Sequence, residues 1–334
     1  MLCYDIGGTH LRGTVYDVVA GKFVNQSVRS TPNYLLQYDA NAEDIFRRII
    51  EECVILGEEL LAGQRPTTIV VGYPGPVTNQ GVALRSPTIL GSVLDKPLNV
   101  GEALRKAHPN VNVHVLNDLI CSGFYFVKQG WQDFCVITVG SGIGNKVFVN
   151  GKAIVGPSGR GGEIGHLKAC GFDSLPFCFR WSEIGAVSSG RGTSCLAKEW
   201  AAARPEDFNG SLLKAEDFQA PANDTELLLT DAFRKNDELA VRIVTAACYP
   251  LAFGIASIHQ AIGIETFMIV GGFSKALGER YRKILVCTVS EMAWNLGQDW
   301  NSMIQLGKVG EEEGLLGAVA YALEHSTNGA TNND

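Results

Sequence analysis

Length, composition and charge limit the classes of protein to which this chain can belong. With 334 residues, 46% of them hydrophobic and 19% charged, the chain exceeds one ordinary domain of about 100 to 200 residues, so we expect two lobes. The formal net charge of -7 comes without a block of lysine or arginine, which argues against binding to nucleic acid or to an anionic membrane surface. Small molecules are the expected partners.

Cysteine usage and the most apolar segment indicate where the protein works. The 9 cysteines are scattered without the spacing of a disulfide framework and without a signal peptide, which predicts a reducing cytoplasm. Residues 239–262 are strongly apolar but are interrupted by Arg242, Pro250 and His259. We therefore expect a buried, Pro-kinked helix there rather than a membrane span.

The chain begins with short apolar segments separated by glycine turns. Residues 2–28, LCYDIGGTHLRGTVYDVVAGKFVNQSV, predict three antiparallel strands. The pattern of strand, glycine-rich turn and strand returns in residues 133–156, where Asn150-Gly151 is a hairpin signal. Two copies of one plan, about 130 residues apart, predict two related halves that face each other.

Between the two copies, the sequence predicts one helix and two buried strands. Asn41 can cap a helix that places Ile45, Ile49 and Cys53 on one face, together with Phe46 and Ile50. The apolar segment 67–77 and the alternating segment 111–116 follow. After the second copy we expect helices, apart from a strand within residues 266–272, and a last helix at residues 314–325.

Each predicted half has a glycine-rich turn after its first strand. The bare backbone amides of such a turn can approach a phosphate, and two turns could hold one polyphosphate from both sides. An ordinary hairpin turn is the competing interpretation. Neither turn is a GxxxxGK[ST] loop and the second is not GxGxxG, which disfavours a P-loop NTPase and a Rossmann dehydrogenase. The candidate phosphate-binding residues are Gly7, Gly8, Thr9, Gly140, Ser141 and Gly142.

The turns carry no lysine, so the phosphate charge must be met in another way. Backbone N–H groups and a Mg²⁺ ion that bridges the β- and γ-oxygens can meet it. Asp5, at the end of the first strand, is the carboxylate expected to hold this ion through its water shell, because Mg²⁺ keeps several waters and takes few protein ligands.

Asn117 and Asp118 directly follow a predicted strand, where ligands bind in open α/β sheets. A hydroxyl that attacks phosphorus must lose a proton, and a positioned carboxylate contributes about 10²- to 10⁴-fold to such a step. Asp118 is therefore the candidate general base, and it can also orient the hydroxyl. The competing interpretation is that the pair only caps the following helix.

The motifs together resemble a known family. DIGGT, GYPGPV, LND, TVGSGIG and GGEIGH occur here in the order seen in the ROK family of bacterial sugar kinases, which are related to bacterial glucokinase. IVGGFS and GEEEGLLGAVAYAL extend the resemblance over nearly the whole chain. It implies an α/β protein with a two-lobed, actin-like (ribonuclease H-like) ATPase fold, each lobe a mixed sheet with helices, and ATP and Mg²⁺ as cofactors.

The resemblance also implies where the lobes lie and what the protein does. The smaller lobe is residues 1–118 with the last helix at about 315–330, and the larger lobe, which carries ATP, is residues 119–314. The implied function is a glucokinase-like, ATP-dependent transfer to the primary hydroxyl of a hexose-like ring. A homodimer stays open, as does polyphosphate as the donor.

Individual roles follow from the resemblance, position by position. Asp118 corresponds to the family's general base and Asn117 to a sugar-hydroxyl partner. Gly75 lines the sugar pocket through its backbone, and Glu163 and His166 of GEIGH are further sugar contacts. The remaining residues implied to bind ATP are Gly271 and Gly272, where the adenosine lies against the backbone.

Two departures from the family pattern lie in the segment after His166, which the resemblance implies contacts the sugar. Of the usual CxCGxxGC zinc motif, this chain keeps only Cys170 and Cys178. A closed zinc site needs four ligands, so we predict that no zinc is bound. We expect nearby aromatic residues to hold this loop in place by apolar packing instead. The family's next sugar-binding glutamate would stand at Gly185, five residues before Gly190, whereas Glu183 stands seven before it.

These departures leave the substrate open, and two other functional classes remain. The ring could be glucose, an amino-hexose or a carbocyclic analogue such as a cyclitol. A non-catalytic, sugar-sensing regulator of the same family would need a helix-turn-helix, for which we expect no room before Asp5. An ATP-driven scaffold of the actin or chaperone type is the third class, and it would turn over ATP regardless of added sugar.

Overall fold

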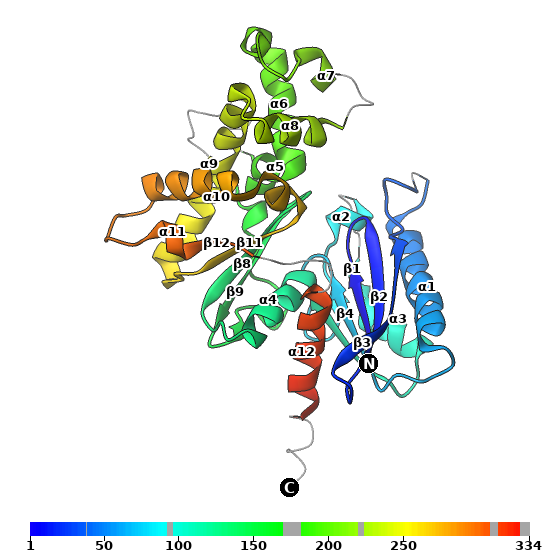
Figure 1. The fold of residues 1–334 in the computed structure, drawn as a ribbon. Helices are drawn as coiled ribbons and strands as arrows, with labels where there is room; N and C mark the ends of the chain where they lie inside the picture. Colours follow the sequence, from blue (N-terminus) through cyan, green and yellow to red (C-terminus); the bar gives the residue numbers. More distant parts are fainter. Residues whose placement is uncertain (38, 92–95, 170–181, 220–223, 308–312, 328–334) are drawn as a thin grey trace. The chain divides into compact units, whose positions relative to one another are not determined.

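The computed structural model describes residues 1–37, 39–91, 96–169, 182–219, 224–307 and 313–327. The chain divides into two compact units. Unit 1 comprises Met1–Gln132, Phe148–Gly161 and Val309–Asp334, and unit 2 comprises Asp133–Val147 and Gly162–Lys308. Each unit is built on one mixed sheet with helices (Figure 1).

The sheet of unit 1 combines a meander with parallel strands. β1 (Leu2–Ile6), β2 (His10–Asp17) and β3 (Lys22–Ser30) pair antiparallel, which confirms the three predicted strands. β4 (Thr68–Tyr73) lies parallel to β1, and β7 (Asn112–Asn117) lies parallel to β4. The strand order is β3-β2-β1-β4-β7.

A sheet of the same plan contains the second copy. Its order is β10-β9-β8-β11-β12, with β11 parallel to both β8 and β12. Asn150 and Gly151 have φ values of 51° and 70° in the β9–β10 turn, as the hairpin prediction requires. β12 was not predicted, because a strand of 3 residues gives almost no alternating pattern. The strands are β8 (Phe134–Val139), β9 (Ile143–Val149), β10 (Lys152–Ala153), β11 (Phe267–Val270) and β12 (Ile304–Leu306).

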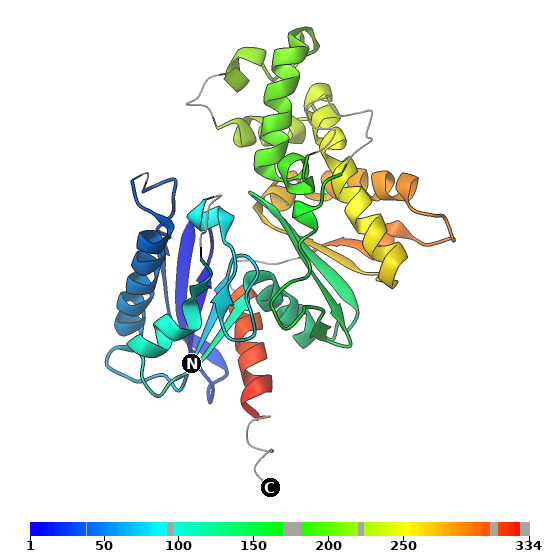
Figure 2. The same cartoon turned by 180° about the vertical axis from the view of Figure 1, so that it is seen from behind.

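Side-chain alternation gives the unit 1 sheet two covered faces. Leu2, Tyr4 and Ile6 belong to the core beneath α1 (Ala42–Leu61), whereas Cys3 packs with α12 (Glu313–Thr327) on the opposite face. The views of Figure 1 and Figure 2 show α1 and α12 on opposite sides of this sheet. Asp5 shares the parity of Cys3, so it belongs to the α12 face.

The predicted cap and apolar face of α1 are confirmed. The Asn41 side chain accepts a hydrogen bond from the Asp44 amide at 2.8 Å, and Ile45, Ile49 and Cys53 are buried. Unit 1 also contains β5 (Val82–Ala83), α2 (Pro87–Leu90), β6 (Leu98–Asn99), α3 (Val100–Ala107) and α4 (Asp118–Lys128).

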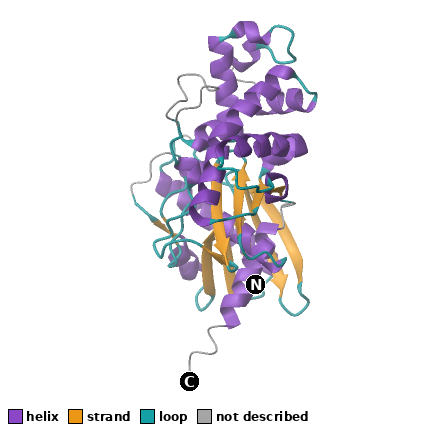
Figure 3. Cartoon of the chain, turned by 90° about the vertical axis from the view of Figure 1, so that its left-hand side faces the viewer, coloured by secondary structure: helices purple, strands orange, loops and turns teal. Residues whose placement is uncertain are grey.

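Helices make up most of unit 2 beyond its sheet (Figure 3). α9 (Glu238–Ile262) contains Pro250 and is long and apolar enough to cross a membrane by length and composition, yet 72% of its most apolar window is buried. It is therefore a core helix of this unit, as predicted. The other helices of the unit are η1 (Ile164–His166), α5 (Ile184–Ser188), α6 (Gly190–Ala203), η3 (Pro205–Phe208), α7 (Ala215–Gln219), α8 (Thr225–Arg234), α10 (Gly272–Met292) and α11 (Trp300–Met303).

Unit 1 extends beyond residue 118, where the sequence placed the border, because α4 packs against α12. A Cβ atom on Gly317 of α12 would lie 1.7 Å from the Cys121 carbonyl oxygen of α4. The missing side chain therefore lets the two helices approach closely. Phe124 and Tyr321 add an edge-to-face ring contact with centroids 5.1 Å apart.

Replacing Gly317 with alanine should lower the free energy of unfolding by about 2 kcal/mol or more, because the methyl group would force α4 and α12 apart. Gly314 is the control in the same helix, since a Cβ there meets nothing within 4 Å. Gly314→Ala should raise stability by up to about 1 kcal/mol through helix propensity. Urea unfolding followed by circular dichroism measures both; equal effects of the two substitutions would contradict the close approach.

Candidate active site

Two carboxylates lie at the same edge of the unit 1 sheet. The parallel register places Asp5 of β1 opposite Gly72 of β4, and Gly72 opposite Leu116 of β7. A Cβ built on Gly72 would be 3.7 Å from both Asp5 Oδ1 and Asp118 Cα. Gly72 thus adjoins both acids, and three adjacent strand ends bring together residues far apart in the sequence.

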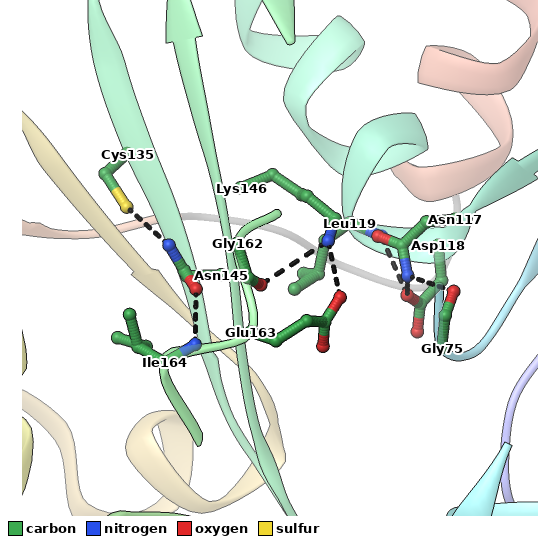
Figure 4. A network of polar contacts seen from close by, with 10 residues as sticks. All are labelled: Gly75, Asn117, Asp118, Leu119, Cys135, Asn145, Lys146, Gly162, Glu163 and Ile164. Carbon is green, nitrogen blue, oxygen red and sulfur yellow. Dashed lines mark hydrogen bonds and ion pairs between the residues drawn. The ribbon is translucent and has the colours of Figure 1, made fainter. Parts of the chain in front are cut away.

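Asn117 and Asp118 cap α4 and hold each other in place (Figure 4). Asn117 Oδ1 accepts from the Leu119 amide at 3.0 Å, and Asp118 Oδ1 accepts from the same amide at 2.9 Å. Asn117 Nδ2 also donates to Asp118 Oδ1 at 2.9 Å. The capping interpretation of this pair is therefore correct, and the same contacts fix the orientation of the Asp118 carboxylate.

Gly75 is tied to this pair through its backbone. Asn117 Nδ2 donates to the Gly75 carbonyl oxygen at 2.9 Å (Figure 4). Gly75 has a φ of +100°, and a Cβ there would lie 2.1 Å from the Arg85 carbonyl oxygen. Only glycine fits this bend, so the structure brings Gly75, Asn117 and Asp118 together as one connected group.

Asp5 is suited to a metal ion that arrives with its own ligands. Its Oδ2 lies 3.3 Å from Arg12 Nη1, and the Asp5 side chain is 26% exposed. Within the described ranges, no group of three or more His, Cys, Asp or Glu side chains could enclose a metal. A single, half-buried carboxylate fits Mg²⁺ that is held mainly by phosphate oxygens and water.

Cys121 lies beneath the two acids without sharing their chemistry. Its Sγ is 3.4 Å from the Cβ position of Gly72. Burial, together with the negative charges of Asp5 and Asp118, raises the pKa of the Cys121 thiol well above its ordinary value. The thiol therefore stays protonated and is unsuited to act as a nucleophile.

In the first glycine turn, one backbone amide is hydrogen-bonded within the turn itself. Gly7 N donates to the His10 carbonyl oxygen at 2.9 Å, which closes the β1–β2 turn. The amides of Gly8 and Thr9 donate to no other part of the described chain, and Thr9 is exposed. Two amides rather than three are therefore available to a phosphate, and Gly7 instead shapes the turn.

The second glycine turn lies beside the Gly271-Gly272 turn. Gly140 N donates to the Gly142 carbonyl oxygen at 3.1 Å, and a Cβ on Gly140 would be 4.0 Å from Gly272 N. Gly271 has a φ of +109°, and a Cβ there would lie 2.6 Å from the Val139 carbonyl oxygen. The ends of β8 and β11 thus approach closely, with the Thr138 hydroxyl 2.9 Å from the Cβ position of Gly271. Glycine backbone at these strand ends is suited to close approach by a nucleotide.

The N-terminus of α6 also joins this edge, which the sequence analysis missed. Gly190 N donates to the Gly140 carbonyl oxygen at 2.8 Å, and the Ser189 side chain caps the helix by accepting from Gly192 N at 3.0 Å. The sequence analysis used Gly190 only to count back to the expected glutamate, although a serine at position 189 is an N-cap signal.

Glu163 is held by two neighbouring residues of β9. Lys146 Nζ lies 2.8 Å from Glu163 Oε1 and 3.4 Å from the Gly162 carbonyl oxygen (Figure 4). Asn145 Oδ1 accepts from Ile164 N at 3.0 Å. Neither Asn145 nor Lys146 was singled out from the sequence, because both stand in an ordinary strand pattern and only the fold brings them to the GEIGH segment.

His166 and Glu183 are brought together despite the unusual spacing of Glu183. His166 Nδ1 lies 3.0 Å from Glu183 Oε2, with the two side chains 58% and 44% exposed. A side chain at position 185 would be crowded, because a Cβ on Gly185 would lie 3.2 Å from the Gly165 carbonyl oxygen. Cys170 and Cys178, on which the zinc prediction depended, lie outside the described residues, as do the aromatic residues expected to pin that loop.

Each unit thus carries a different set of functional groups. Unit 1 carries an oriented carboxylate with an amide partner and a second carboxylate suited to a hydrated cation. Unit 2 carries backbone turns suited to a nucleotide, and a Glu–His–Glu set that can exchange hydrogen bonds with hydroxyl groups. These are the parts that phosphoryl transfer to an alcohol requires.

Comparison with known proteins agrees with this chemistry. The family model described as "ROK family" matches residues 1–325. A C(7)-cyclitol 7-kinase of Streptomyces hygroscopicus subsp. limoneus is 33% identical over 291 residues, which cover 84% of this chain and 81% of the relative. An N-acetylmannosamine kinase of Pasteurella multocida (strain Pm70) is 26% identical over 329 residues, which cover 97% of this chain and 96% of the relative.

Solved structures agree over the whole chain. A ROK hexokinase from Thermus thermophilus gives a TM-score of 0.70 at 25% identity, covering 98% of this chain and 99% of the other. A ROK family glucokinase from Streptomyces griseus, in complex with glucose and AMPPNP, gives 0.71 at 21% identity, covering 97% and 100%. The predicted actin-like ATPase fold, with a mixed sheet and helices in each unit, is confirmed.

Substituting Asn117 with aspartate should lower the free energy of unfolding by about 1 to 3 kcal/mol at pH 7, because a carboxylate would face the Gly75 carbonyl and the Asp118 carboxylate in place of a donor. The loss should shrink toward pH 4, where protonation restores a donor.

Asn41→Asp is the matched control, since Asn41 caps α1 through its oxygen alone. That substitution should change stability by less than about 0.5 kcal/mol, because either residue is a good N-cap. Thermal unfolding at pH 7 and pH 4 measures both variants. If Asn117→Asp were as neutral as Asn41→Asp, the donor role of Asn117 would be disproved.

Proposed function

Since the chain belongs to the ROK family of sugar kinases and is a sugar phosphotransferase, we propose that it transfers the γ-phosphoryl group of ATP to the primary hydroxyl of an uncharged ring polyol. A carbocyclic sugar is the first candidate substrate. The observation that carries the reaction is the Asp118 carboxylate, which two hydrogen bonds orient at the end of β7.

Asp118 is the proposed general base. Its Oδ1 is held by Asn117 Nδ2 and by the Leu119 amide, so the carboxylate needs no rearrangement before it accepts the proton of the attacking hydroxyl. The N-terminus of α4 stabilises the carboxylate as an anion. The proton moves from the hydroxyl to Asp118 while the hydroxyl oxygen attacks the γ-phosphorus and ADP leaves.

Backbone groups and Asp5 are proposed to bind the donor. The amides of Gly8 and Thr9 and the turn of Gly140, Ser141 and Gly142 would hold the phosphates, and Gly271-Gly272 would support the adenosine. Asp5 would hold Mg²⁺ through water. Mg²⁺ supplies neutralisation of charge on the phosphoryl oxygens when it is bound.

Hydroxyl recognition is assigned to the polar groups described above. Asn117 and the Gly75 backbone would contact the ring from unit 1 residues, while Glu163, His166 and Glu183 supply acceptors and an imidazole from unit 2. Such groups bind a polyol through its many hydroxyls and impose little demand on the ring atom type. A ring oxygen and a ring carbon could therefore both be accepted.

Relatives favour a carbocyclic sugar over a hexose. The cyclitol kinase is 33% identical, whereas the N-acetylmannosamine kinase is 26% and the hexokinase 25% identical. A hexose remains the second candidate because the hexokinase covers the whole fold. The solved ROK transcriptional regulator, at 19% identity, shares the fold alone. We place the reaction in the cytoplasm, where ATP is supplied.

A coupled ADP-release screen across cyclitols, hexoses and amino-hexoses tests the substrate class directly. Turnover should be highest with a cyclitol that carries a primary hydroxyl. It should also require Mg²⁺, because Asp5 offers a carboxylate that can hold a hydrated cation beside the phosphates. ATP turnover that is independent of every added polyol would overturn the proposal in favour of an ATP-driven scaffold. Inorganic polyphosphate replaces ATP in a parallel series.

Replacing Asp118 with asparagine should lower kcat by at least about 10²-fold with little change in stability, the size expected for the loss of a general base. The control is Asp44→Asn on the exposed surface of α1, where the carboxylate pairs with Arg47 in the same helix. Steady-state kinetics and thermal unfolding compare the two variants. Near wild-type activity of Asp118→Asn would rule out this base.

A further inference from the structure

Lys146 is a buried cation that the roles above do not require. It stands on β9 and is 1% exposed. A lysine is almost never fully buried unless it has a partner, because removing its charge from water is costly. A specific favourable interaction must therefore offset the cost of burying the Lys146 charge.

The interaction that offsets this cost is an ion pair between Lys146 and Glu163, a residue proposed to bind substrate. Lys146 Nζ lies 2.8 Å from Glu163 Oε1 and 3.4 Å from the Gly162 carbonyl oxygen. Gly162 adopts a φ of +72°, where a Cβ would lie 3.0 Å from Lys146 Cδ. Glycine at this position lets the lysine stem pass, so the chain is shaped around the pair.

The ion pair gives the two oxygens of the Glu163 carboxylate different surroundings. Oε1 is taken by Lys146, whereas Oε2 accepts no hydrogen bond from any residue that the structure describes. The Glu163 side chain is 32% exposed, and that of Lys146 is 2% exposed. Solvent or a ligand thus reaches the carboxylate but not the ammonium group, and one oxygen remains for a substrate hydroxyl.

The pair also changes the charge that a substrate meets. A lone carboxylate attracts an ammonium group, and this attraction is strong where water is excluded. With Lys146 at 2.8 Å, the pair has almost no net charge, and an incoming ammonium group is repelled by the lysine behind the carboxylate. A hydroxyl, which carries no charge, still finds the acceptor oxygen.

We propose that Lys146 is a positioning and specificity-determining residue, which fixes Glu163 as an acceptor for one hydroxyl and makes the site favour an uncharged polyol over an analogue that carries an ammonium group. The proposal rests on the proposed function and narrows its substrate class to neutral polyols. Discrimination here comes partly from a repulsive element directed at the competing ligand.

Lys146→Met tests the charge, since methionine keeps an unbranched side chain without the ammonium group. The substrates are the neutral polyol that the wild type phosphorylates fastest and its analogue with one ring hydroxyl replaced by an amine, compared at pH 6.5; for a hexose these are glucose and glucosamine. The ratio of kcat/KM for the amine over the neutral substrate should rise about tenfold or more, chiefly through KM. Lys146→Arg, which keeps the charge, should stay within about threefold of the wild-type ratio.

Glu163→Gln gives an opposite prediction and does not require the lysine variant to fold. It removes the carboxylate charge that Lys146 faces at 2.8 Å, so the amine-to-neutral ratio should fall about tenfold. In the Glu163→Gln background, adding Lys146→Met should raise the ratio again. A lysine that only braces the loop would lower kcat/KM equally for both substrates and leave every ratio unchanged.

The outcomes separate this proposal from the function it rests on. If no polyol stimulates ADP release by the wild type, the kinase proposal fails and this one with it. If the wild type turns over and the folded variants, checked by thermal unfolding, keep the wild-type ratio within about threefold, only the role of Lys146 is disproved.

Discussion

The amide group of Asn117 is the contact on which the arrangement of unit 1 depends. Its oxygen caps α4 through Leu119 N, and its nitrogen donates to both the Gly75 carbonyl and Asp118 Oδ1. With 5% exposure, it has little access to water, so each lost bond would leave a buried polar group unsatisfied. One side chain thereby couples a helix start, the bend at Gly75 and the orientation of the acid.

In unit 2, glycines determine how closely the strand ends and loops approach, because these residues have no side chain. Gly271 has β8 backbone within 2.6 Å of its Cβ position, and Gly165 has the Ile143 carbonyl oxygen within 2.0 Å of its own. Side chains at these positions would separate the strand ends from the loops that pass them. The glycine-rich sequence therefore specifies close approach between neighbouring backbone segments.

The sequence predicted the elements well where local patterns decide them. Asn41 specified a helix start and Asn150-Gly151 a hairpin, because capping and turn chemistry act within a few residues. Prediction failed where partners are distant. Nothing near Lys146 in the sequence indicates that a glutamate 17 positions later will neutralise it, and β12 is too short to carry a pattern.

The site was also predictable only in part. The competing interpretations of Asn117-Asp118, as a helix cap or as functional residues, need not exclude each other, because the cap contacts themselves orient the acid. Gly7 shows the opposite case: the motif suggested a phosphate contact, but its amide closes the turn. A sequence motif locates a glycine turn, whereas the coordinates are needed to say which of its amides already has a partner within the chain.

The two sheets share one strand order, yet their equivalent positions have diverged. In unit 1 the last residues of β1 and the turn are Asp5-Ile6-Gly7, whereas in unit 2 the corresponding residues are Thr138-Val139-Gly140. The hydroxyl of Thr138 lies 2.9 Å from the Cβ position of Gly271, where a carboxylate would repel a bound phosphate. An acid is tolerated in the copy proposed to hold the hydrated cation and is replaced by a neutral side chain in the copy proposed to support the nucleotide. Divergence at this one position gives the two copies different chemistry at equivalent strand ends.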